Sequence, residues 1–115
     1  MSNQGKDSFK AYSYFCPCGQ LFLTIHVSLT RLPQRQLDKR HVVDEKLNHI
    51  AHFSTGNKYY ITRSDGGYEQ RIQLLCRRCT LECAYALEAA PGYIYVDPTL
   101  VNEKPVTVSV SNLKE

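Results

Sequence analysis

The chain has 115 residues, 43% of them hydrophobic, with five cysteines and a formal net charge of +3. This length suits one domain, and the hydrophobic share is that of a folded chain rather than a disordered one. No signal peptide opens the chain, and no apolar run approaches the roughly 20 residues that span a bilayer. We therefore expect a soluble protein of a reducing compartment, where neighbouring cysteines more often bind metals or act in redox chemistry than form disulfides. Charges of both signs are interleaved, so the composition is no signature of nucleic-acid binding.

The first predicted elements are a flexible tail over residues 1–11 and a β-hairpin. Residues 12–15 are expected to form its first strand. Residues 20–27 form the second, because apolar and polar side chains alternate there with the period of two that a half-buried strand shows. The turn between the strands, residues 16–19, carries the first two cysteines.

The middle of the chain is predicted to contain a surface connection and one short helix. Residues 30–40 are rich in Arg, Gln and Lys, as an exposed connection would be. Asp44 can cap a helix that runs to about His52. Apolar residues at helical spacing would face the core: Val43, Leu47, Ile50 and Ala51. A loop is expected over residues 54–57.

The clearest predicted hairpin follows this loop. Residues 58–64 and 68–75 form its strands, and an Asp-Gly-Gly turn at 65–67 joins them with glycines that permit positive φ angles. The second strand runs directly into Cys76. Further strands are expected over residues 84–87, 92–96 and 106–110.

Two pairs of cysteines lie far apart in the sequence, each at the end of a predicted strand: Cys16 and Cys18 in a CxCG turn, and Cys76 and Cys79 in a CxxC turn. Zinc prefers four soft ligands in a tetrahedron, and a tight turn with two cysteines supplies half of it. A site closed by four thiolates has no open coordination position, so it is structural rather than catalytic. The sequence therefore predicts one structural Zn²⁺ held by these four cysteines.

The predicted fold is mainly β: small antiparallel sheets joined by the four-cysteine zinc site, in the manner of a zinc ribbon or a β-tent, with one short helix. The domain is expected to span residues 12–111, with a second tail over 112–115. Two alternatives to the metal site stay open, namely buried free thiols and a redox-active pair of Cys76 and Cys79. The fifth cysteine, Cys83, is interpreted as a core thiol, with a role as substitute ligand as the alternative.

Three arginines near the second cysteine turn are candidates for binding a partner: Arg71, Arg77 and Arg78. Arg77 and Arg78 stand between two ligands in the sequence and would be presented rigidly to an acidic protein or a phosphate. The alternative for all three is an ordinary solvated surface.

No catalytic constellation is recognisable in the sequence. A GxSxG motif, a phosphate-binding loop and an HExxH motif are all absent. The other candidate metal ligands are His41, His49 and His52. No cysteine or carboxylate clearly completes a second site with them. We therefore expect a protein that is not an enzyme and that acts by binding partners.

These residues resemble a known family. The segment Tyr14-Phe15-Cys16-Pro17-Cys18-Gly19-Gln20 is similar to the YYCxCGQ opening of the STING ER exit protein (STEEP) family. The similarity continues through Leu32-Pro33, residues 40–44 and 67–71, the CxxC turn and Ala90-Pro91, and covers roughly residues 12–101. Two positions depart from the family pattern: Thr80 stands where glycine is usual, and Cys83 where an aliphatic residue is usual.

The resemblance implies the same four metal ligands and a non-enzymatic adaptor function. Members of the family promote exit of STING from the endoplasmic reticulum in COPII-coated vesicles. This implies trafficking machinery or membrane cargo as partners, and a cytoplasmic location at the periphery of the endoplasmic reticulum. Members are also linked to the nucleus and to splicing assemblies, so the alternative is an RNA-associated or spliceosome-linked nuclear interaction module.

Overall fold

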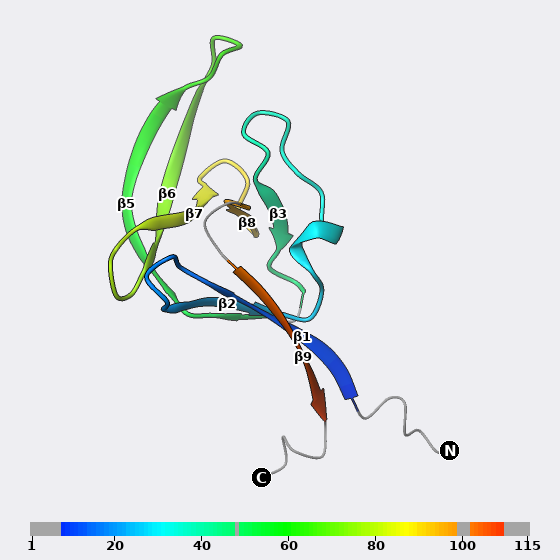
Figure 1. Ribbon diagram of the computed structural model, residues 1–115. Helices are drawn as coiled ribbons and strands as arrows, with labels where there is room; N and C mark the ends of the chain where they lie inside the picture. Colours follow the sequence, from blue (N-terminus) through cyan, green and yellow to red (C-terminus); the bar gives the residue numbers. More distant parts are fainter. Residues whose placement is uncertain (1–7, 48, 99–101, 110–115) are drawn as a thin grey trace.

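A computed structural model describes residues 8–47, 49–98 and 102–109, which form two antiparallel β-sheets (Figure 1). The first sheet, in the order β4-β2-β1-β9, contains β1 (Ser8–Phe15), β2 (Leu21–Ile25), β4 (His49–Ala51) and β9 (Asn102–Ser109). The second, in the order β3-β8-β7-β6-β5, contains β3 (His41–Asp44), β5 (Phe53–Thr62), β6 (Tyr68–Cys76), β7 (Glu82–Leu87) and β8 (Tyr93–Val96). A 3-10 helix, η2 (Leu29–Arg31), follows β2. The predicted mainly β class with small antiparallel sheets is thus confirmed. No helix in the described part of the chain has both the length and the apolar character needed to cross a membrane.

Both predicted hairpins are present. Three of their four strands are longer than expected, whereas β2 is shorter and ends at Ile25. Tyr14 lies opposite Leu23 in the first hairpin, and Thr62 lies opposite Tyr68 in the second. β1 begins at Ser8 because its first residues pair with β9, so the predicted tail is corrected from Ser8 onward. The predicted loop over residues 54–57 instead belongs to β5, whose register against β6 shifts at this point.

The predicted helix over residues 44–52 is wrong. β3 ends at Asp44, a turn follows, and β4 covers His49–Ala51. The Asp44 carboxylate accepts a hydrogen bond from the amide of Lys46 at 2.9 Å, and the Asp44 carbonyl accepts one from the amide of Leu47. Asp44 therefore caps a tight turn with the kind of bond that a helix cap makes. The helix-like spacing of apolar residues comes from two short strands on either side of that turn.

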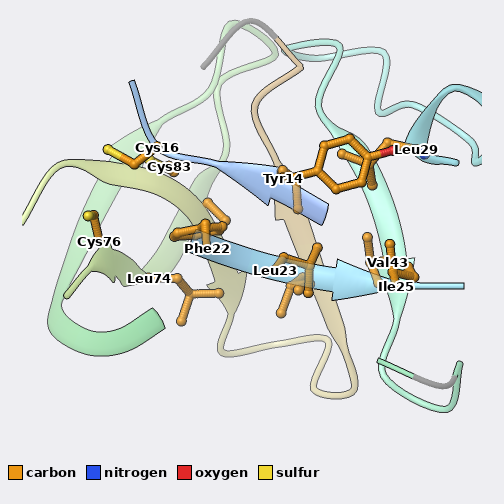
Figure 2. Packing of buried hydrophobic residues seen from close by; sticks show 13 residues of the cluster. Tyr14, Cys16, Phe22, Leu23, Ile25, Leu29, Val43, Leu74, Cys76 and Cys83 are labelled. Atoms are coloured by element: carbon orange, nitrogen blue, oxygen red, sulfur yellow. Dashed lines mark hydrogen bonds between the residues drawn. The ribbon is translucent and has the colours of Figure 1, made fainter. Parts of the chain in front are cut away.

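The hydrophobic core joins residues of both sheets (Figure 2). From β2 it takes Phe22, Leu23 and Ile25, and from the second sheet Val43, Leu74, Ala84, Ile94 and Val96. Tyr14 of β1 is also buried, and its hydroxyl accepts a hydrogen bond from the amide of Leu29 at 2.7 Å. Phe22, expected on the polar face of β2, packs against Phe53 with ring centroids 5.0 Å apart. β2 is therefore covered on both faces at this position.

Candidate metal centre

The first cysteine turn joins β1 to β2. The amide of Cys16 donates to the carbonyl of Gln20 at 2.9 Å, and the amide of Gly19 donates to the carbonyl of Cys16 at 2.8 Å. Gly19 has a φ angle of 97°, in the left-handed region that glycine enters without steric cost. These features close a tight turn around Cys16 and Cys18.

The second cysteine turn joins β6 to β7 and repeats this arrangement. The amide of Cys76 donates to the carbonyl of Leu81 at 2.9 Å, and the amide of Thr80 donates to the carbonyl of Cys76 at 3.0 Å. Thr80 follows the second cysteine of its turn as Gly19 does, and it too is left-handed, with φ 63°. The amide of Arg78 also donates to the sulfur of Cys76 at 3.3 Å.

The two turns lie side by side (Figure 1) and bring the four predicted ligands together: Cys16, Cys18, Cys76 and Cys79. Their sulfur atoms all lie within 4.8 Å of one another. The close contacts run between the turns, 3.4 Å from Cys16 to Cys79 and 3.6 Å from Cys18 to Cys76. With metal–sulfur bonds of about 2.3 Å, the sulfurs of a zinc tetrahedron are about 3.8 Å apart. The thiols are therefore spaced to fit one tetrahedral ion.

The backbone of the second turn favours a thiolate at Cys76. Burial acts to raise the pKa of this thiol, but hydrogen bonds from the amides of Cys79 and Arg78, together with the neighbouring thiols, lower it to about 6. At Cys16 burial prevails, and the pKa is raised. Because metal binding requires thiolates, an ion that binds here must displace the protons of thiols such as Cys16.

Cys83 lies beside the four-sulfur cluster without belonging to it. Figure 2 shows it next to Cys16, among the residues of the hydrophobic core. Its side chain is fully buried, and burial raises the pKa of its thiol to about 11. These surroundings agree with the interpretation of Cys83 as a core thiol.

The histidines do not form a second metal site among the described residues, where the four cysteines are the one group spaced to hold an ion. The ring of His49 is hydrogen-bonded to the carbonyl of Leu47 at 2.7 Å, and the ring of His52 to the hydroxyl of Thr24 at 3.4 Å. Both rings therefore have local partners within the fold.

The structure separates the three arginines that were predicted to bind a partner. Arg77 and Arg78 are exposed in the second cysteine turn, and no described carboxylate lies within ion-pair distance of either. Arg71 is instead buried in β6. Its guanidinium donates to Glu69 at 2.8 Å and lies 3.9 Å from the centroid of the Tyr85 ring.

Arg71 belongs to a buried cluster of charged and aromatic side chains that sequence reasoning missed. Arg35, from the connection after η2, forms an ion pair with Glu69 at 3.0 Å. The hydroxyl of Tyr85 donates to Asp38 at 2.6 Å and also contacts Arg35. The sequence holds one signal of this cluster, since Glu69 and Arg71 are two residues apart and share a face of the strand.

Fold and site together define a small β domain in which two cysteine turns bring four thiols close enough to hold a metal ion. The model of the STEEP1 domain matches residues 5–107, and the chain therefore belongs to this family, as its resemblance indicated. A STING ER exit protein of Drosophila melanogaster is 30% identical over 76 residues, which is 63% of this chain. The matched region spans 31% of that relative's length, so the chain corresponds to about a third of it. Neither comparison supports the RNA-associated alternative.

Proposed function

We propose that this chain is a non-enzymatic adaptor domain that promotes exit of membrane cargo from the endoplasmic reticulum. The observation that carries this proposal is the STEEP1 domain match over residues 5–107, which includes both cysteine turns. The proposal is also supported by the Drosophila relative, which is named a STING ER exit protein. In this proposal the domain acts at the cytoplasmic periphery of the endoplasmic reticulum. Its partners are trafficking machinery of COPII-coated vesicles or membrane cargo such as STING.

The proposed cofactor is one structural Zn²⁺ bound by Cys16, Cys18, Cys76 and Cys79. When bound, the ion supplies a cross-link between two turns that are about sixty residues apart in the sequence. Four thiolates complete a tetrahedral shell, so no position is left for a substrate. The donor set therefore supports a scaffold that presents a surface to partners rather than a catalytic centre.

The surface that we assign to partner binding is the second cysteine turn. Arg77 and Arg78 are exposed there, between the two ligands that this turn contributes. Leu81 adds an exposed apolar side chain at the end of the same turn. Two exposed arginines on a hydrogen-bonded turn that also carries an exposed apolar side chain suit an acidic segment of a protein partner. Arg71 is not included, because its guanidinium is occupied within the fold.

The proposal is tested in cells that depend on this protein, by measuring how fast STING leaves the endoplasmic reticulum and which proteins are recovered with the chain. The double variant Arg77→Glu/Arg78→Glu should slow exit and lose trafficking proteins while it retains its metal. The matched control is Arg31→Glu/Lys46→Glu, which makes the same charge change at two exposed positions outside the cysteine turns. Unaltered exit in the first variant would remove the turn from the proposal. Recovery of neither trafficking factors nor membrane cargo with the wild-type chain would overturn the adaptor function itself.

A further inference from the structure

β5 forms a free edge of the second sheet. In the strand order β3-β8-β7-β6-β5 it has β6 as its neighbour on one side, and none of the described strands lies on the other. Figure 1 shows β5 on the outer side of the molecule, with the tip of the β5–β6 hairpin projecting beyond the rest. Such an edge offers unpaired backbone groups to another strand.

The register identifies the residues whose backbone groups face outward from this edge. The amide of Glu88 donates to the carbonyl of Gln70, so the backbone of Gln70 faces β7. Tyr60 lies opposite Gln70 and therefore occupies a non-hydrogen-bonded position against β6. Because this pattern alternates, the amides and carbonyls of Lys58, Tyr60 and Thr62 all face the free side.

The outward-facing run is short, regular and nearly uncharged. It is bounded by the register shift between Thr55 and Lys58 and by the turn after Thr62. Its sequence, Lys-Tyr-Tyr-Ile-Thr, has the aromatic and β-branched residues that favour strands. Its one charge is that of Lys58, which forms an exposed ion pair with Glu88 at 3.2 Å. Tyr60 is 69% exposed, which leaves a large aromatic side chain uncovered at the centre of the edge.

We propose that two copies of this chain pair along β5, antiparallel and with the two-fold axis at Tyr60, to form one continuous sheet. This inference does not depend on the proposed function. In this register Tyr60 faces Tyr60 of the second copy, and Lys58 faces Thr62. Any other antiparallel register shortens the overlap of the regular run, and the shift that centres the axis on Lys58 places two like charges opposite each other.

The side-chain pairs of this register are mutually compatible on both faces of the sheet. The outward-bonded positions place aromatic against aromatic and lysine against threonine. Between them, Tyr59 faces Ile61 of the second copy, an aromatic and β-branched pair of the kind that stabilises antiparallel strands. A two-fold interface needs such self-complementarity, because each residue meets its counterpart from the same segment.

The register is tested by sedimentation of the metal-loaded full chain over a concentration series. The wild type should shift from its monomer mass of 13.2 kDa towards twice that mass as concentration rises. Thr62→Lys, which faces Lys58 of the other copy twice per dimer, should weaken association by about tenfold, whereas Thr62→Glu at the same position should strengthen it. Adding Lys58→Glu together with Glu88→Lys to Thr62→Lys should restore association, because opposite charges then face each other across the interface while the ion pair between positions 58 and 88 is kept.

Further variants separate the edge from the rest of the hairpin. Thr62→Pro removes an outward amide without touching the bonds to β6, so it should abolish pairing and leave metal content and far-ultraviolet circular dichroism unchanged. Tyr60→Lys should do the same. Tyr68→Lys is the matched control, because Tyr68 is 74% exposed on the neighbouring strand and lies off the axis. A chain that stays monomeric at every concentration would overturn the proposal. A dimer whose association is the same in the wild type, Thr62→Lys and Thr62→Glu would also overturn it.

Discussion

Thr80 adopts in the second cysteine turn the left-handed backbone conformation that Gly19 adopts in the first, with φ angles of 63° and 97°. A β-branched residue in this region is strained by about 1 kcal/mol or more, which glycine avoids. The resemblance to the family marks this position as one where glycine is usual. The second turn is therefore held closed against a local backbone cost.

Thr80→Gly should stabilise the metal-loaded domain, because it removes this backbone strain. We expect a gain of about 1 kcal/mol in the free energy of unfolding, or about 4 °C in the unfolding midpoint. Calorimetry of the two proteins measures this difference. The reverse change supplies the control: Gly19→Ala meets no atom within 4 Å of its new Cβ, so any loss of stability must come from the backbone conformation. A Thr80→Gly protein less stable than the wild type would contradict this reading of the turn.

Glu69 is the carboxylate on which the buried charge cluster depends. Its side chain is 5% exposed and accepts hydrogen bonds from both Arg35 and Arg71. Glu69→Gln removes the counter-charge of Arg35 and leaves Arg71 with Asp38 alone, at 3.5 Å, which should cost about 3 kcal/mol of stability in denaturant unfolding. The control, Glu45→Gln at an exposed position, should change stability by less than about 0.5 kcal/mol. Equal stabilities of the two variants would show that the cluster contributes nothing.

The carboxylate of Glu69 should also make the free energy of unfolding depend on pH. The Arg35 guanidinium holds the pKa of Glu69 below its ordinary 4.5, against the opposing effect of burial and with the help of Arg71. Because the pKa is lower in the folded state, the stabilisation is fully present above pH 4.5 and is lost as the pH falls through the folded-state pKa. The difference in unfolding free energy between wild type and Glu69→Gln should therefore shrink as the pH falls below 4.5. Both proteins carry the same four candidate ligands. The pH dependence of metal binding is therefore common to both and cancels in the difference between their unfolding free energies. A difference that stays constant as the pH falls through 4.5, over the range in which both proteins keep their metal, would contradict the assignment.

The approach of the four cysteines could be predicted from the sequence because each cysteine pair lies in a short contiguous motif. Each CxC or CxxC turn follows a strand with a recognisable alternation, and the chemistry of four thiols requires the turns to meet. The hairpin that leads to Cys76 was predictable for the same reason, since its Asp-Gly-Gly turn and alternating strands are contiguous in the sequence.

The features that the sequence did not predict depend on contacts between segments that are distant in the chain. Asp44 makes a bond that serves a tight turn as well as a helix start, so local rules could not choose between them. Arg71 was expected at the surface because its contacts are distant in the sequence. Asp38 lies 33 positions earlier, and the ring of Tyr85 belongs to the neighbouring strand. Similarly, Phe22 is buried and packs against Phe53 on the face of β2 that alternation assigned to solvent.

Cys83→Ala distinguishes a core thiol from a fifth ligand. The side chain is fully buried next to the cluster, and its pKa is raised by burial, so we expect a protonated thiol that takes no part in metal binding. The variant should bind the same amount of metal as the wild type and lose about 1 kcal/mol of stability through the small cavity that it leaves. Metal analysis and denaturant unfolding of the same sample measure both quantities. A fall in metal content in the folded variant would identify Cys83 as a ligand.

We infer that one ion joins the two cysteine turns, whose closest sulfurs, those of Cys16 and Cys79, lie 3.4 Å apart although their positions differ by 63 in the sequence. Native mass spectrometry of the purified chain, before and after a strong chelator, tests it most directly. We expect one zinc ion per chain, loss of that ion in Cys76→Ser/Cys79→Ser, and unfolding or marked loosening of the wild type when the chelator removes it. A chain that carries no stoichiometric metal and still unfolds cooperatively at the same midpoint would contradict the account.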